Sequence, residues 1–106
     1  MINYNLNTHS NTLSCQFIGR LDTNNTSKIA ESVEEKIKDH TGDDQNTAPK
    51  VVFDIEQVDY IASAFIRICI KAVQKAGKIN FAIINASPMI KKTFKIAGLD
   101  EELNVS

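Results

Sequence analysis

The feature that most constrains the fold is the stretch from Val51 to Lys75, which joins a short apolar run to an amphipathic segment. The run from Val51 to Ile55 is apolar apart from Asp54, as in strands that are buried on both faces. A short loop leads to Ser63, where apolar residues begin to recur at helical spacing. A strand that leads into a helix in this way predicts an α/β fold with a partly parallel sheet.

The same periodicities predict the order β-β-α-β-α-β-α for one domain over residues 1–106. The two opening runs alternate apolar and polar residues, which is typical of a half-buried hairpin. The predicted strands are Ile2–Asn7, Leu13–Ile18, Val51–Ile55 and Ile79–Asn85, and the predicted helices are 25–39, 63–76 and 88–97. A fifth strand would come from the tail, Asp100–Ser106. We therefore predict a mixed sheet of four to five strands with helices packed against it.

Residue types typical of helix ends support these boundaries. Thr23 to Thr26 offers several N-caps for the first helix, and Ser87 followed by Pro88 is a favourable start for the third. Gly77 and Gly98 follow the second and third helices, as expected for C-terminal caps. Between the first helix and the next strand, the polar stretch from 40 to 49 predicts a loop.

Composition excludes several classes of function. Of the 106 residues, 42% are hydrophobic and 24% are charged, as in ordinary globular domains. A net charge of −1 gives no general attraction for nucleic acid or for an anionic membrane, and no apolar run is long enough to span a bilayer. The N-terminus carries no secretory signal, so we expect a cytoplasmic protein.

No residue pattern indicates a catalytic, metal or cofactor site. Cys15 and Cys69 lack metal or redox spacing and are interpreted as buried thiols, and the two histidines fall in polar loops. The four glycines are not grouped as a phosphate-binding loop requires. We therefore expect no enzyme and no cofactor. An enzyme that used Asp54, Asp59 or Cys69 would need a polar pocket around one of these groups.

Cationic side chains lie on or just after the second predicted helix and on the third. They are Arg67, Lys71, Lys75, Lys78, Lys91, Lys92 and Lys95. One interpretation is a positive surface for an acidic partner or a phosphate backbone, and the other is a pair of ordinary solvated helix faces. The near-neutral chain and the lack of interleaved aromatic residues favour the second interpretation, with no nucleic-acid partner.

Ser63 also has two interpretations. As an N-cap it would stabilise the helix by about 1 kcal/mol, which alone accounts for a serine at this position. As a phosphoacceptor it would gain about −1.5 to −2 charges beside the positive end of the helix dipole, with Arg67 one turn further along. On the residues alone, the N-cap is favoured.

Five segments in order resemble the STAS domain family, the family of sulfate transporters and anti-sigma factor antagonists. They are Gly19–Asp22, Val51–Asp54, Asp59–Ala64, Asn85–Pro88 and Ile96–Asp100. No single segment is specific, but together they extend the resemblance from the opening hairpin to Leu103. The resemblance implies a single STAS-like α/β domain.

The resemblance also implies a function. In single-domain members of this kind, a partner kinase that acts as an anti-sigma factor phosphorylates the serine at the start of the second helix, and phosphorylation breaks the complex. Ser63 occupies that place. The chain would then be a non-enzymatic partner-switching regulator, reset by a serine phosphatase and present as a monomer or weak dimer. The partner-binding residues implied are Asp22, Tyr60, Ala62, Ala64 and Arg67.

Two positions depart from the family pattern. Ala62 stands where the family has an acidic residue, and Phe65 stands where it commonly has glycine. A kinase that reads this loop could notice both changes, because one charge is missing and a bulky ring stands at the first helical turn. The phenylalanine and the isoleucines on the wide apolar face of this helix are nevertheless interpreted as core residues. The two departures favour the alternative function, a STAS binding or scaffold module that is not phosphorylated and recognises a small ligand or a protein partner.

Overall fold

The computed structural model describes residues 2–41 and 49–106, and its strands and helices follow the predicted order. The elements are β1 (Ile2–Asn7), β2 (Thr12–Leu21), α1 (Thr23–Thr41), β3 (Lys50–Ile61), α2 (Ser63–Ala76), the 3-10 turn η1 (Lys78–Asn80), β4 (Phe81–Ile84) and α3 (Pro88–Ile96). Most of the loop predicted between 40 and 49 lies outside the described residues, and His40 belongs to the last turn of α1.

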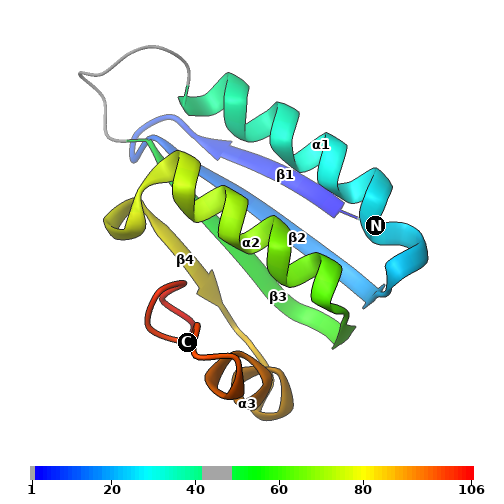
Figure 1. Cartoon of the computed structure of the whole chain (residues 1–106). Coiled ribbons are helices and arrows are strands. Elements are labelled where there is room, and N and C mark those ends of the chain that lie inside the picture. The colour runs from blue at the N-terminus through cyan, green and yellow to red at the C-terminus, as the bar shows by residue number, and fades with distance from the viewer. Residues whose placement is uncertain (1, 42–48) are drawn as a thin grey trace.

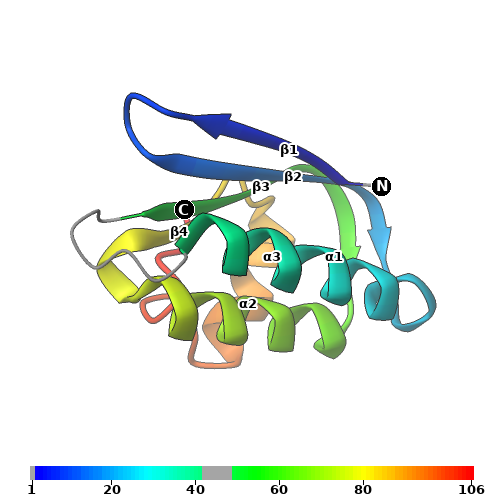
Figure 2. The same cartoon turned by 90° about the horizontal axis from the view of Figure 1, so that it is seen from above.

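The described strands form a mixed four-stranded sheet in the order β1-β2-β3-β4, which confirms the predicted architecture. β1 is antiparallel to β2, whereas β2, β3 and β4 are mutually parallel. The tail does not add a fifth strand, because it forms only one parallel bridge, between Val105 and Ile83. α1 and α2 lie side by side on one face of the sheet (Figures 1 and 2).

β3 is longer than the sequence predicts. The polar residues after Ile55 indicate a loop, but the backbone stays paired with β2 as far as Leu21 and Ile61. Val58 and Ile61 are buried and hold this second half of the strand against the core. The register shifts beside Gly19, whose φ of 95° is a conformation that glycine adopts without strain. The carboxyl ends of β2 and β3 are therefore aligned.

β4 and α3 match their predictions in part. The predicted strand over 79–85 is shortened to Phe81–Ile84, and Ile79 is 91% exposed in η1. The N-cap prediction for α3 is confirmed, since Ser87 Oγ accepts a hydrogen bond from the N–H of Ile90 at 3.3 Å. Gly98 follows α3 with φ 74°, as expected for a C-terminal cap.

Four phenylalanines from the sheet and α2 form the centre of the core. The ring centroids of Phe17 and Phe53, of Phe17 and Phe65, and of Phe53 and Phe81 are each 5.0 Å apart in edge-to-face geometry. Phe65 is fully buried, which confirms the interpretation of this phenylalanine as a core residue and keeps its ring away from the surface that a kinase would meet. The pattern of apolar residues in α2 fixes this orientation, because Phe65 shares a helical face with Ile68, Cys69 and Ala72.

Candidate functional site

The candidate site lies where β2 and β3 end together. Leu21 and Ile61 are paired as the last residues of their strands, and the next residue in each case leads into a helix. The N–H of Ala62 donates to the carbonyl of Leu21 at 2.8 Å. The pairing places Asp22 and Ser63 at the same edge of the sheet, although they are far apart in sequence. α1 and α2 also begin at this edge (Figure 1).

Ser63 is the first residue of α2 and does not cap it. Ala62 is the N-cap, with an extended backbone at φ −98° and ψ 165°, and no side chain provides a capping hydrogen bond. The N-cap interpretation of Ser63 is therefore wrong. The physical reason is the bond from Ala62 to Leu21, which holds Ala62 in extended geometry at the end of the strand, so that Ala62 takes the N-cap position and the helix begins at Ser63, one residue earlier than a Ser63 cap requires. Within the described part of the chain, no partner binds the exposed Ser63 hydroxyl.

Asp22 has a structural role that the sequence did not reveal. Its Oδ1 accepts hydrogen bonds from the N–H groups of Asn24 at 3.0 Å and Asn25 at 3.1 Å, so Asp22 is the N-cap of α1. The N-cap therefore precedes the predicted range of Thr23 to Thr26. The other carboxylate oxygen lies 4.0 Å from Nε of Arg20. Asp22 can thus present negative charge while it holds the start of α1.

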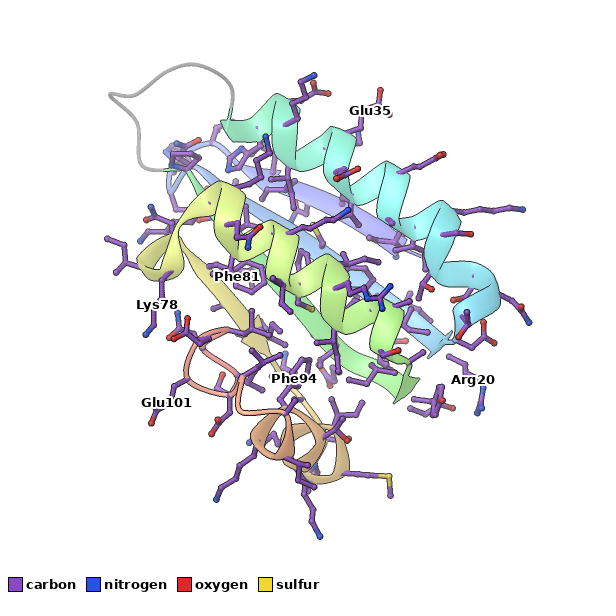
Figure 3. All side chains as sticks on the ribbon, viewed as in Figure 1. Arg20, Glu35, Lys78, Phe81, Phe94 and Glu101 are labelled. Atoms are coloured by element: carbon purple, nitrogen blue, oxygen red, sulfur yellow. The ribbon has the colours of Figure 1, made fainter. Side chains whose placement is uncertain are left out.

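Tyr60 and Arg20 form an exposed pair beside the strand ends. The Arg20 guanidinium carbon lies 4.0 Å from the ring centroid of Tyr60, which is 40% exposed. The two residues are partners in the β2–β3 register, and Figure 3 shows Arg20 at the outer end of β2. The sequence indicates Tyr60 as a site residue but not Arg20. The only sequence signal was its place in the Gly19–Asp22 turn, because the register that brings it over Tyr60 belongs to the fold.

The three remaining predicted site residues lie on or next to the first turns of α2. Ala62 and Ala64 are half-buried, and Arg67 is exposed one turn after Ser63. Ala64 and Arg67 also line a groove between α1 and α2. All six predicted site residues therefore lie at or near one end of the α1–α2 layer, and five of them come from the segment between Tyr60 and Arg67.

The cysteine considered for catalysis, Cys69, is poorly placed for it. Cys15 and Cys69 are buried in the core. Burial raises the pKa of the Cys15 thiol to about 12 and raises that of Cys69 well above its ordinary value. Asp54 accepts hydrogen bonds from the Glu56 N–H and from the Asn85 side chain at the surface. Among residues 2–41 and 49–106, no group of three or more His, Cys, Asp or Glu side chains is arranged to hold a metal ion.

The cationic side chains do not form one continuous surface. Lys71 lies 3.8 Å from Glu34 of α1, and Lys78 lies 3.9 Å from Glu102 of the tail. Lys91, Lys92 and Lys95 line a separate hollow beside α3, away from the α1–α2 groove. The two helices therefore present two distinct cationic faces.

Comparison with known proteins places this geometry in a family. The profile of the STAS domain matches residues 3–106. No curated protein matches the sequence significantly. None of the described helices has the length and apolar character needed to cross a membrane.

Solved structures with the same fold come from several bacteria. A STAS-domain anti-sigma factor antagonist from Planctomyces limnophilus is 20% identical with a TM-score of 0.78, covering 99% of this chain and 87% of that one. An anti-sigma factor antagonist from Mycobacterium paratuberculosis is 18% identical with a TM-score of 0.76, covering 99% and 85%. The phosphorylated form of the Bacillus cell fate determinant SpoIIAA is 15% identical with a TM-score of 0.67, covering 100% and 91%. Together with the match over nearly its whole length, these findings mean that the chain belongs to the STAS domain family.

Proposed function

We propose that this protein is a cytoplasmic, non-enzymatic partner-switching regulator of the anti-sigma factor antagonist type. It binds a serine kinase that acts as an anti-sigma factor while Ser63 is unmodified, and it releases the kinase when Ser63 carries phosphate. A serine phosphatase restores the binding form. The observation that carries this proposal is the exposed hydroxyl of Ser63. Ser63 is the first residue of α2, and its side chain has no capping role.

The surroundings of Ser63 suit a phosphate group. The first N–H groups of a helix lack partners within the helix, and they lie at the positive end of its dipole. Arg67 is exposed one turn away. A phosphate would add about −1.5 to −2 charges at this surface. Because Ile61 and Phe65, on either side of Ser63 in the chain, are buried in the core, the fold would persist while the contact surface became more negative.

The partner surface of the proposal surrounds Ser63. Asp22 and Tyr60 flank it from the ends of β2 and β3, and Ala62, Ala64 and Arg67 flank it along α2. A contact formed around an uncharged hydroxyl is weakened when a charge is placed in it. We therefore expect Ser63→Glu to weaken kinase binding by about tenfold or more. Equal affinities of the wild type and Ser63→Glu in calorimetric titration would contradict the switch.

Phosphorylation is tested by incubation with the candidate kinase and ATP, followed by intact-mass and peptide mass spectrometry. One added phosphate is expected on Ser63, and none on Ser63→Ala. Ser87→Ala is the matched control, because Ser87 also lies at a helix N-terminus but its hydroxyl accepts from the Ile90 N–H. Phosphate that is retained in Ser63→Ala and lost in Ser87→Ala would refute Ser63 as the acceptor.

The alternative function, an unphosphorylated binding or scaffold module, is favoured by one observation. Ala62, the N-cap of α2, is where the family pattern has an acidic residue. Phe65 no longer favours this alternative, because its ring is in the core and does not alter the surface. A stable kinase complex without transfer of phosphate would support the alternative over the switch.

A further inference from the structure

A groove of about 650 Å³ runs between α1 and α2. It begins at the first turns of the two helices, with Thr23 on α1 and Ala64 on α2, and therefore starts beside the Ser63 surface. α1 and α2 point in the same direction, because each follows one of two parallel strands (Figure 1). The groove thus extends from the proposed switch toward the carboxyl ends of the helices.

The floor of this groove is apolar and already ordered. Ala30, Val33 and Ile37 contribute from α1, and Ile68 and Ala72 contribute from α2. Four of them are buried in the core cluster, and Ala30 packs against it. A bound segment would therefore meet a preformed surface, which lowers the entropic cost of association.

The rim of the groove is mainly positive. Arg67, Lys71 and Lys75 line it from α2 at intervals of four residues, so they form one row with about 6 Å between successive side chains. Glu34 is the acidic side chain that lines the groove from α1. The neighbouring carboxylate of Glu35 points away from α2 (Figure 3).

One ion pair crosses the groove, between Lys71 Nζ and Glu34 Oε1 at 3.8 Å. The two side chains remain 67% and 60% exposed, so the pair contributes little to stability and can exchange partners. Within the described ranges, Arg67 and Lys75 have no carboxylate at ion-pair distance. The row therefore offers unsatisfied positive charge on both sides of the Lys71 pair.

We propose that the α1–α2 groove binds an acidic amphipathic helix of a protein partner. Aliphatic side chains on one face of that helix pack on the apolar floor, and carboxylates at i, i+4 spacing face the row of Arg67, Lys71 and Lys75. One partner carboxylate takes the place of Glu34 at Lys71. The apolar floor and the carboxylate on the rim disfavour a phosphate backbone, and the cationic row disfavours a basic segment. The inference extends the proposed partner surface and rests on the proposed function in taking that partner to be a protein.

The first test uses two labelled helical peptides of about 15 residues, long enough to form a helix in contact with a protein. Both carry leucine at i, i+3, i+4 and i+7, and they differ only in carrying either glutamate or lysine at the flanking positions. Fluorescence anisotropy with the full chain is expected to show the glutamate peptide binding at least about tenfold more tightly. Raising the salt from about 0.05 M to 0.3 M should weaken that binding, because the rim charges are exposed. Equal affinities, or a preference for the lysine peptide, would overturn the proposal.

Variants of exposed residues then locate the binding site without disturbing the core. The double variant Arg67→Glu, Lys75→Glu should weaken the glutamate peptide about tenfold, whereas Glu34→Gln should strengthen it about two- to fivefold by freeing Lys71. Lys28→Glu is the matched control, because Lys28 is exposed on α1 outside the groove and changes the net charge equally per substitution. A loss in Lys28→Glu equal to that of Arg67→Glu alone would overturn the assignment to the groove.

Amide chemical shifts provide an independent readout of the binding site. Shifts caused by the glutamate peptide should concentrate on α1 and α2, and shifts confined to α3 would overturn the proposal. The two proposals fail separately. Peptide binding without phosphorylation of Ser63 would refute the proposed switch and support the proposed groove. Phosphorylation of Ser63 without peptide binding would support the switch and refute the groove.

Discussion

Replacement of Asp22 separates its structural role from its proposed role in partner binding. The side chain caps α1 through hydrogen bonds of 3.0 and 3.1 Å to the N–H groups of Asn24 and Asn25. It also presents a negative charge beside Arg20 at the proposed partner surface. Asp22→Asn keeps an oxygen acceptor and removes the charge, whereas Asp22→Ala removes both. The two variants therefore give different results for the two roles.

The expected loss of stability in each Asp22 variant follows from these contacts. Loss of an N-cap costs about 1 kcal/mol, within a range of about 0.5–2 kcal/mol. The ion pair with Arg20 adds only a fraction of that, because its atoms are 4.0 Å apart and its side chains are 63% and 34% exposed. We expect Asp22→Ala to lower the melting temperature by about 4–8 °C. Asp22→Asn should stay within about 0.5 kcal/mol of the wild type, since asparagine caps as well as aspartate.

Two assays measure the two effects. Urea unfolding followed by circular dichroism gives the stability of each variant, with Asn24→Ala as a control in the same helical turn. Calorimetric titration with the kinase gives the affinity, which we expect to fall about fivefold or more in both Asp22 variants, because both lack the charge. Equal stability of Asp22→Ala and Asp22→Asn would refute the capping argument. Wild-type affinity in Asp22→Asn would refute the role of the Asp22 charge in the partner surface.

The remaining predictions concern the core. Phe65→Ala should lower the free energy of unfolding by about 3–5 kcal/mol in urea denaturation, because it empties the centre of the aromatic cluster. Met89 is 76% exposed, so Met89→Ala should lower the free energy of unfolding by less than about 0.5 kcal/mol. Equal losses of stability in Phe65→Ala and Met89→Ala would contradict the assignment of Phe65 to the core. Burial raises the pKa of Cys15 from 9.0 to about 12, so above pH 9 the unfolded chain loses this proton before the folded chain does. Stability should therefore fall as pH rises from 9 toward 12, by up to about 1.4 kcal/mol per pH unit for this thiol, and a slope unchanged in Cys15→Ala would contradict the prediction.

Much of the fold could be predicted because the local pattern and the final environment agree. The residues predicted for the second helix coincide with α2 (Ser63–Ala76), whose apolar face is wide and whose stop is a glycine at φ 93°. The start of α3 was predicted for a similar reason, because Ser87 and Pro88 act within one helical turn. The resemblance to the STAS family rested on short segments that the match over residues 3–106 confirms as a whole.

The errors occur where pairing between distant segments overrides local preference. β3 continues through Glu56 and Asp59 because β2 is long enough to pair with it, which no local pattern indicated. Ser63 does not cap α2 because Ala62, held in extended geometry by its hydrogen bond to the end of β2, is itself the N-cap. The stacking of Arg20 on Tyr60 likewise depends on register across two strands.

The sequence by itself determined the order of the elements, the family, and the serine at the start of α2, because hydrophobic periodicity and end-capping residues act over a few neighbouring positions. The tertiary structure alone decided what surrounds that serine. Parallel pairing of β2 with β3 brought Asp22 beside the start of α2, and packing of α1 against α2 created the groove with its cationic rim. Such contacts join residues about 40 positions apart, and their geometry is set by strand register and helix packing, which no short stretch of sequence specifies.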